Sequence, residues 1–129
     1  MTSGSTPAMP DQAVPGASSL IFRVGAGRWY LPVETVVEVL RGVTITRVPG
    51  AAEGVRGLVN HRGRVLTVAH LGRILGVPSD DGGREEVVVV EAAGHRFALA
   101  VDAVIELAPE PRTGLATLDL DQIANAIFG

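Results

Sequence analysis

Two stretches of this chain resemble each other closely enough to limit the folds that the chain can adopt. Residues 20–40 read LIFRVGAGRWYLPVETVVEVL, and residues 87–107 read VVVVEAAGHRFALAVDAVIEL. Each contains a short apolar run, a turn with glycine, a second β-rich run and an apolar segment broken by one glutamate. The following segments also match, because 66–74 aligns with 115–123. This internal repeat predicts two pseudo-equivalent lobes, each made of a few short strands and a helical turn.

The strand-like runs are short and regularly spaced, which favours small barrels, because a closed sheet leaves few unpaired strand edges. We expect strands over 20–24, 28–33, 35–40, 45–48, 55–60, 64–68, 87–90, 97–101, 104–107 and 114–120. Short helices are expected over 69–75, ended by Gly76, and over 121–127, with Asp121 as the N-cap. Only APEPRTG separates Leu107 from Leu115, so the second lobe should lack at least one strand and have an open edge. The expected fold class is therefore all-β, with a shortened second lobe.

The N-terminal residues differ in composition from the rest of the chain. Residues 1–18 read MTSGSTPAMPDQAVPGAS and contain almost no large apolar side chain. Such a stretch cannot bury enough surface to offset the entropy lost on ordering. We expect a disordered tail over 1–18 and a folded domain over 19–128; a docking peptide in the tail is the alternative.

Composition argues against several classes of function. The chain has no cysteine, which excludes disulfides, zinc-thiolate sites and cysteine nucleophiles. Its three histidines lack metal-ligand spacing, and its serines lie in the tail or the 78–84 linker, outside any nucleophile elbow. No apolar run reaches about 18 residues, and no secretory signal is evident. We expect a cytoplasmic protein that is not an enzyme, has no cofactor, catalytic residue or metal, and does not insert into the membrane.

Nucleic-acid binding is also not expected, because the formal net charge is −3 and the arginines are scattered. A barrel that binds nucleic acid would need a basic face with exposed aromatic side chains. Four of the five aromatic residues stand in strand-like runs that should pack into the core, and Phe128 stands outside them.

Two charged residues stand at the ends of apolar runs. Glu38 lies within VVEVL, and Arg62 directly follows GLVNH. Each is either solvated or half-buried, and a half-buried charge needs a partner. A guanidinium fits a carboxylate in a planar fork, so the two residues could meet, but the sequence leaves both possibilities open. Asn60 to Gly63 reads as a β-turn, since asparagine and glycine tolerate positive φ.

The segment 54–76, GVRGLVNHRGRVLTVAHLGRILG, resembles the signature of the CheW family. That signature reads Gly-Val-x-Asn-x-Arg-Gly, then a strand with Pro-Val-x-Asp-Leu and a short helix. The residues that fit are Gly57, Val59, Asn60, Arg62, Gly63, Val68 and Leu71. Segments 30–40, 45–49, 97–107 and 118–123 fit further family patterns in the same order, so the resemblance covers about 20–127. Thr67 and His70 depart from it, because the family has proline and aspartate there.

The resemblance implies two intertwined SH3-like β-barrel lobes with short helices. Lobe one would cover about 32–78 and lobe two about 85–128, with the first strand shared. It implies a non-enzymatic adaptor that binds the cytoplasmic tip of a chemoreceptor and the regulatory domain of a CheA-type histidine kinase at membrane-associated arrays. The alternative is a scaffold of a non-motility chemosensory pathway, controlling pili or gene expression, with an altered kinase contact.

The resemblance also implies a set of partner-binding residues. Glu38 and Arg62 would form an ion pair tied to receptor binding, and Asn60 would belong to the same site. Val33, Val36 and Val37 would line an apolar groove for an amphipathic receptor helix. The open edge of the short lobe could recruit another partner by strand addition.

Overall fold

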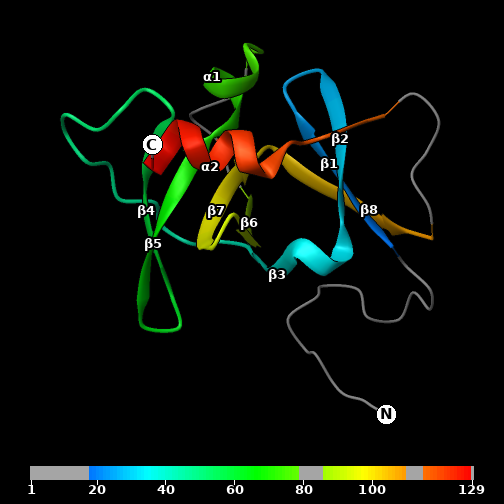
Figure 1. The fold of residues 1–129 in the computed structure, drawn as a ribbon, viewed down its shortest axis with the longest axis horizontal. Coiled ribbons are helices and arrows are strands. Elements are labelled where there is room, and N and C mark those ends of the chain that lie inside the picture. Colours follow the sequence, from blue (N-terminus) through cyan, green and yellow to red (C-terminus); the bar gives the residue numbers. More distant parts are fainter. Residues whose placement is uncertain (1–17, 79–85, 110–114, 129) are drawn as a thin grey trace.

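The structure is a computed structural model that describes residues 18–78, 86–109 and 115–128 (Figure 1). The tail expected over 1–18 lies outside these residues except for Ser18. The elements of the first half are β1 (Ser19–Val24), β2 (Gly27–Pro32), the 3₁₀ helix η1 (Val33–Thr35), β3 (Val36–Leu40), β4 (Val55–His61), β5 (Arg64–His70) and α1 (Leu71–Leu75). The elements of the second half are β6 (Glu86–Ala92), β7 (His95–Val101), β8 (Ala103–Ala108), β9 (Ala116–Thr117) and α2 (Leu120–Phe128).

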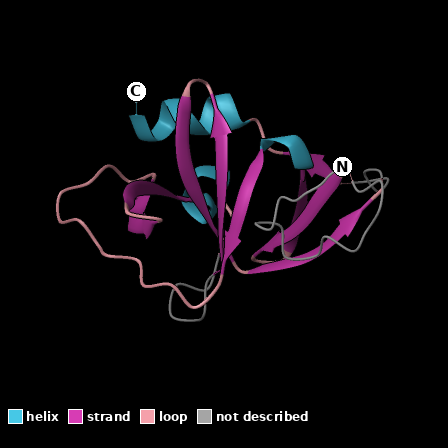
Figure 2. Ribbon diagram, turned by 90° about the horizontal axis from the view of Figure 1, so that it is seen from below, coloured by secondary structure: helices cyan, strands magenta, loops and turns pink. Residues whose placement is uncertain are grey.

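The strands form two sheets, and each sheet takes strands from both halves of the sequence. One sheet has the order β8-β1-β2-β9 and the other has the order β3-β6-β7-β5-β4. Figures 1 and 2 show the two sheets side by side, with α2 lying across one end. This arrangement confirms an all-β fold of two intertwined lobes with short helices. The four-stranded sheet is the smaller one, and its outer strands are β8 and the two-residue β9.

Neither sheet is built from one half of the sequence alone. β6 and β7 of the second half pair within the same sheet as β3 to β5. The lobe ranges 32–78 and 85–128, with the first strand shared, stay a prediction. The remaining strands of the second half, β8 and β9, pair with β1 and β2. The repeat describes strand content correctly, because β1–β2 and β6–β7 are equivalent hairpins. Those hairpins lie in different sheets and face each other across the first core, to which both contribute buried side chains.

The valine run Val87–Val90 explains why β6 lies in the middle of the molecule. All four side chains are fully buried, as expected for a strand covered on both faces. Val88 and Val90 belong to a core between the two sheets, together with Phe22, Leu31 and Leu99. Val87 and Val89 belong to a second core with Val59, Leu66, Val68, Ala98 and Ala100. All five strands of the larger sheet contribute side chains to this second core, so the sheet curves around it.

The strand expected over 45–48 is reduced to a single bridge. Thr46 pairs with Leu58 of β4, and the neighbouring residues form no strand. The backbone there follows β4 closely, because a Cβ atom on Gly57 would lie 2.4 Å from the Thr46 carbonyl oxygen. The partly buried Ile45 side chain packs on the second core. The packing of Ile45 and the bridge between Thr46 and Leu58 hold residues 45–48 against β4 without a longer run of strand hydrogen bonds.

The C-terminal elements begin and end elsewhere than expected. The strand predicted over 114–120 is only β9, and the helix begins at Leu120. Asp119, rather than Asp121, is the cap: its Oδ1 accepts a hydrogen bond from the Gln122 backbone N–H at 3.1 Å. The helix begins there because Leu118, Leu120 and Ile123 are buried in the first core. Neither α-helix of the described residues is long and apolar enough to cross a bilayer.

The short helix after β5 is close to the prediction. α1 begins at Leu71, two residues later than expected, because β5 continues to His70. It ends at Gly76, whose φ of 72° is left-handed and costs glycine little. Among the aromatic side chains, Phe22 and Phe97 are fully buried, and Trp29 is partly buried against the first core. Phe128 is exposed and stacks on His95.

Candidate functional site

A β-bulge in β3 determines where the Glu38 side chain lies. Val36 is opposite Val90 of β6 and Glu38 is opposite Val89, so Val37 is an extra residue on β3. Residues directly opposite each other on paired strands project to the same face of the sheet. Glu38 therefore lies on the face of Val89, which is the face that carries the second core.

His61 reaches the same place from β4. It is the last residue of that strand and stands two residues after Val59, so both side chains project to the second core. The His61 side chain is only 2% exposed, and its Nε2 lies 2.7 Å from Glu38 Oε1. Since β3 and β4 are the two outer strands of the five-stranded sheet, this contact joins its two edges.

Arg62 completes the cluster from the turn that follows β4. It has a φ of 54°, and the Asn60 Oδ1 accepts a hydrogen bond from the Gly63 N–H at 3.0 Å, which closes the turn. Its Nε donates to Glu38 Oε1 at 3.1 Å and its Nη2 donates to Oε2 at 3.3 Å. Such paired contacts are the geometry in which arginine binds a carboxylate most strongly.

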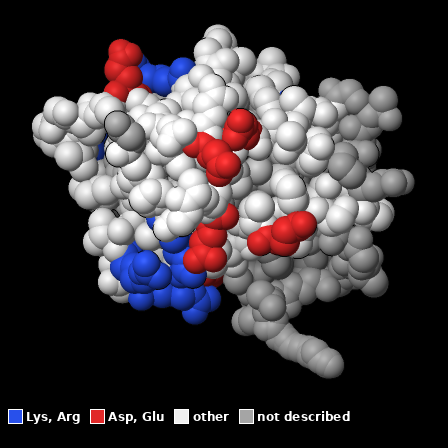
Figure 3. Space-filling view, in the orientation of Figure 1, with Lys and Arg blue, Asp and Glu red and all other residues white. Residues whose placement is uncertain are grey.

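The charges of this cluster are unequally exposed. The Glu38 side chain is 19% exposed and that of Arg62 is 66% exposed. Figure 3 shows basic side chains at the tip of the β4–β5 hairpin, which carries Arg62 and Arg64, beside acidic ones. Burial by itself would raise the pKa of Glu38, but the hydrogen bonds and charges of Arg62 and His61 outweigh it and lower that pKa below its ordinary value. The carboxylate is therefore ionised at neutral pH.

One polar atom of the cluster stays without a partner. His61 Nδ1 is buried and has no hydrogen-bond partner among the described residues. An ionised carboxylate only accepts hydrogen bonds, so Nε2 must carry the hydrogen of the contact with Glu38. An unpaired buried nitrogen costs about 1–3 kcal/mol. This cost opposes the stabilisation that the hydrogen bond between His61 and Glu38 contributes.

The three expected groove valines lie beside Glu38 in the chain. Val33 is in η1 and Val36 is in β3; both are partly buried and pack on the first core. Val37 packs on the second core. The structure thus brings Glu38, Arg62 and the Asn60 turn together and leaves part of each valine accessible. A role of these residues in partner binding stays a prediction.

Sequence reasoning missed His61 as a member of the site. The sequence places it in the β-turn over 60–63, although its spacing of two from Val59 on a strand indicates an inward side chain. No three His, Asp or Glu residues in the described segments stand close enough to hold a metal ion.

Comparisons with known proteins agree on one family. The family model described as CheW-like domain matches residues 18–111. The protein FrzA of Myxococcus xanthus is 34% identical over 101 residues, covering 78% of this chain and 63% of that protein. The chemotaxis protein CheW of Thermotoga maritima is 28% identical over 86 residues, covering 67% and 57%. The protein PilI of Pseudomonas aeruginosa is 35% identical over 95 residues, covering 73% and 53%.

A solved structure shows the same fold. The crystal structure of the scaffolding protein TtCheW from Thermoanaerobacter tengcongensis superposes with a TM-score of 0.67 at 27% identity, over 78% of this chain and 73% of that one. The matched region spans between 53% and 63% of the length of the three curated relatives. The family model covers most of the described chain, and the sheets, the hairpin signature and the relatives agree with it. The chain therefore belongs to the CheW-like domain family.

Proposed function

We propose that this chain is a non-enzymatic adaptor that links the cytoplasmic tip of a chemoreceptor to the regulatory domain of a CheA-type histidine kinase. It would work in the cytoplasm at membrane-associated receptor arrays. Family membership supports the proposal, as does the likeness to a protein named as a scaffold. The observation that carries it is the cluster of Glu38, His61 and Arg62, in which an ion pair is fixed between β3 and the turn after β4.

The cluster is suited to hold a receptor helix by two kinds of contact. Val37, partly buried on the same core as Glu38, and Val33 and Val36, partly buried on the first core, offer apolar surface to the apolar face of an amphipathic helix. Arg62 uses two of its five N–H bonds on Glu38, which leaves three for acceptors on a partner. Because Glu38 fixes the guanidinium plane in advance, the side chain loses less conformational entropy on binding. Glu38 would thus act by positioning Arg62.

The kinase contact is proposed for a different part of the surface. The four-stranded sheet ends at β8, which is hydrogen-bonded to β1 along one edge. The outer edge of β8 is suited to pair with a strand of a related domain. The partly exposed Ile105 side chain on β8 would add apolar contact there.

The alternative is a scaffold of a non-motility chemosensory pathway with an altered kinase contact. Identity to FrzA and PilI is 34% and 35%, against 28% to the Thermotoga chemotaxis protein. In both versions the chain works through two protein-binding surfaces. The choice of pathway would change the partners and leave the mechanism the same.

A binding titration tests the proposal. The folded chain is titrated with the regulatory domain of the kinase and with a receptor-tip peptide, as wild type and as Glu38→Ala, Arg62→Ala and Arg64→Ala. Arg64 is the matched control, because it is exposed and lies in the same hairpin two residues further on. We expect Arg62→Ala and Glu38→Ala to weaken receptor binding about tenfold or more. Kinase binding should stay within about twofold in all variants, and Arg64→Ala should bind like wild type.

Two results would contradict parts of the proposal. A folded wild type that binds neither partner would remove the adaptor function. Equal loss of receptor binding in Arg64→Ala and Arg62→Ala would show that the general charge of the hairpin matters and the fixed ion pair does not.

A further inference from the structure

The family signature leaves open which residue stands between Asn60 and Arg62. It reads Gly-Val-x-Asn-x-Arg-Gly, and its second x falls on His61. In this chain the open position holds a histidine whose side chain is only 2% exposed. Burial of polar atoms costs free energy unless they are hydrogen-bonded, and an apolar side chain would avoid that cost. Among the described residues, the ring nitrogens make one hydrogen bond, and it goes to Glu38.

A bulge near the start of β4 turns the His61 side chain inward. The pairing of β4 with β5 shifts between Val55 and Gly57, so Arg56 is an extra residue on β4. Because side chains alternate between the faces of a strand, one extra residue moves every later side chain to the other face. From Gly57 onward this register directs Val59 and His61 to the second core. Without the bulge the ring would project outward.

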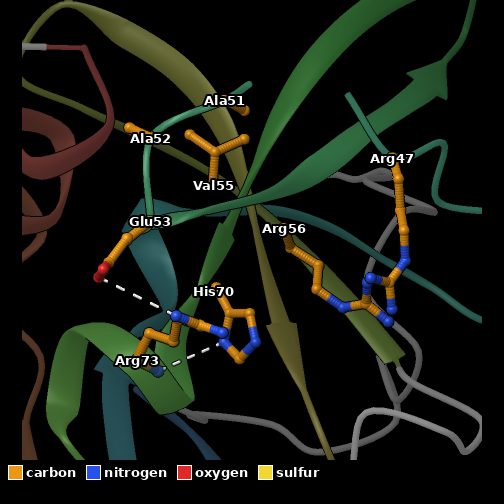
Figure 4. A pocket seen from close by; sticks show the side chains of 8 residues that line it. All are labelled: Arg47, Ala51, Ala52, Glu53, Val55, Arg56, His70 and Arg73. Carbon is orange, nitrogen blue, oxygen red and sulfur yellow. Dashed lines mark hydrogen bonds and ion pairs between the residues drawn. The ribbon is translucent and has the colours of Figure 1, made fainter. Parts of the chain in front are cut away.

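The bulged residue itself lies far from the ring. The Arg56 side chain lines a pocket of about 260 Å³ together with Arg47, His70 and Arg73 (Figure 4). That pocket lies at the start of β4, whereas His61 is the last residue of the strand. Five residues of extended strand separate Arg56 from His61, a distance of roughly 17 Å. A substitution of His61 therefore leaves the lining of this pocket unchanged.

The Glu38 carboxylate meets the ring and the guanidinium on the same oxygen. Its Oε1 lies 2.7 Å from His61 Nε2 and accepts a hydrogen bond from Arg62 Nε at 3.1 Å. Its Oε2 accepts a hydrogen bond from Arg62 Nη2 at 3.3 Å. The bulge at Val37 directs Glu38 to the face of the second core, as the bulge at Arg56 directs His61. Two bulges, one on each outer strand of the sheet, thus bring this donor and acceptor together.

The two donors to Glu38 differ in their conformational freedom. The His61 ring is buried and has few rotatable bonds, whereas the long Arg62 side chain is 66% exposed. A buried side chain has already lost its rotamer freedom on folding, and an exposed arginine loses its freedom when a partner binds. The shorter contact, from the immobile ring, therefore fixes the carboxylate, and the carboxylate fixes the guanidinium.

We propose that His61 is a positioning residue of the receptor contact. Its Nε2–H holds the Glu38 carboxylate in the orientation that presents the Arg62 guanidinium to the partner. The proposal rests on the proposed function for what Arg62 meets, but the two hydrogen bonds lie within this chain. Because the ring is buried, His61 acts through Arg62 and does not contact the partner itself.

The test places amide side chains of two lengths at position 61. The glutamine Nε2 stands as many bonds from the backbone as the histidine Nε2, so His61→Gln keeps a donor within reach of Glu38. The asparagine amide is one bond shorter, so His61→Asn removes the donor. Both variants bury a neutral amide, and a merely structural role of the ring would affect them alike. The receptor-tip peptide is titrated against both full-length variants, and against Arg62→Ala with and without His61→Asn.

The expected affinities follow from the order of the contacts. His61→Asn should weaken peptide binding about fivefold, which corresponds to the ordering of one long side chain on binding. His61→Gln should bind within about twofold of wild type. Adding His61→Asn to Arg62→Ala should change the affinity no further, because His61 acts through Arg62. Equal losses in His61→Gln and His61→Asn, or a further loss in the double variant, would overturn the proposal.

An NMR measurement on the free ¹⁵N-labelled chain gives a second result that needs no peptide. The Arg62 side-chain Nε–H should be ordered in wild type and His61→Gln and mobile in His61→Asn. The exposed Arg64 in the same hairpin is the control and should not change. If wild type fails to bind the peptide while this pattern holds, the receptor function is wrong and His61 still positions Arg62.

Two NMR results would overturn the positioning role whatever the peptide does. The first is unchanged order of the Arg62 Nε–H in His61→Asn. The second is a wild-type ring without hydrogen on Nε2, which the ring ¹⁵N shifts report even if His61→Asn fails to fold.

Discussion

His61 and Glu38 join the two outer strands of the five-stranded sheet through one hydrogen bond, 2.7 Å between Nε2 and Oε1. Both side chains lie on the face of the second core and cover one end of it. The same carboxylate holds Arg62 at the surface, where a partner would meet it. The closure of the sheet and the geometry of the proposed receptor site therefore depend on the same group.

Replacing Glu38 by glutamine should destabilise the chain in a pH-dependent way. The pKa of Glu38 is lowered in the folded chain, so the ionised carboxylate stabilises the fold above its unfolded pKa of about 4.3. That contribution is lost as the pH falls through the folded pKa. We expect Glu38→Gln to lower the free energy of unfolding by about 1–3 kcal/mol at pH 7. Urea unfolding at pH 7 and pH 3 measures the difference.

The exposed Glu34 of η1 provides the control for this experiment. Glu34→Gln should change the free energy of unfolding by less than about 0.5 kcal/mol at either pH. If the free energies of unfolding of wild type and Glu38→Gln differ by the same amount at pH 3 as at pH 7, the charge of Glu38 does not stabilise the fold as assigned.

The two contacts of Glu38 should contribute unequally to stability. Arg62 is 66% exposed, and exposed ion pairs contribute about 0.2–1 kcal/mol, whereas the buried His61 would be left with an unsatisfied nitrogen. Double-mutant cycles with Glu38→Gln, His61→Phe and Arg62→Gln measure both couplings. We expect the coupling of Glu38 with His61 to exceed that with Arg62. The reverse order would mean that the surface pair, and not the buried one, closes the sheet.

Gly57→Ala should destabilise the chain more than Gly42→Ala does. A Cβ at 57 would lie 2.4 Å from the Thr46 oxygen, so the bridge between Thr46 and Leu58 would have to open. Gly42 is the control: its φ is 70°, but nothing lies within 4 Å of an added Cβ. Gly42→Ala should cost about 1–2 kcal/mol from backbone strain alone, and Gly57→Ala more. Equal losses in thermal or urea unfolding would show that the close approach contributes little.

Asp119→Ala should weaken α2, because Asp119 is its cap. Loss of a side-chain cap costs about 0.5–2 kcal/mol. Asp121 stands in the first turn of the helix and is exposed, so Asp121→Ala should remove only the favourable interaction with the helix dipole, about 0.3–1 kcal/mol. Urea unfolding measures the loss in the free energy of unfolding for both variants, and the loss should be larger for Asp119→Ala. A larger loss in Asp121→Ala would assign the cap to the residue that the sequence suggested.

The position of the helix start shows why that assignment was wrong from sequence. Both aspartates are acceptable caps by their side-chain chemistry, and they stand two residues apart. Asp119 became the cap because the helix begins at Leu120, and it begins there with Leu118, Leu120 and Ile123 buried in the first core. Strand 45–48 failed for a related reason, because its pairing depended on how closely β4 could approach. In each case contacts with residues distant in the sequence overrode the local preference.

The sequence by itself determined the alternation of strands and turns, the strand formed by the valine run of β6, the end of α1 at Gly76 and the family signature around Arg62. These features are local, since they depend on side-chain periodicity and on backbone conformations that few residues adopt. Only the tertiary structure decided that Glu38 meets His61 and that Arg47 and Arg56 line the same pocket. Both outcomes rest on bulges at Val37 and Arg56. A bulge is a property of two paired strands, and its register is fixed only when both cores have closed.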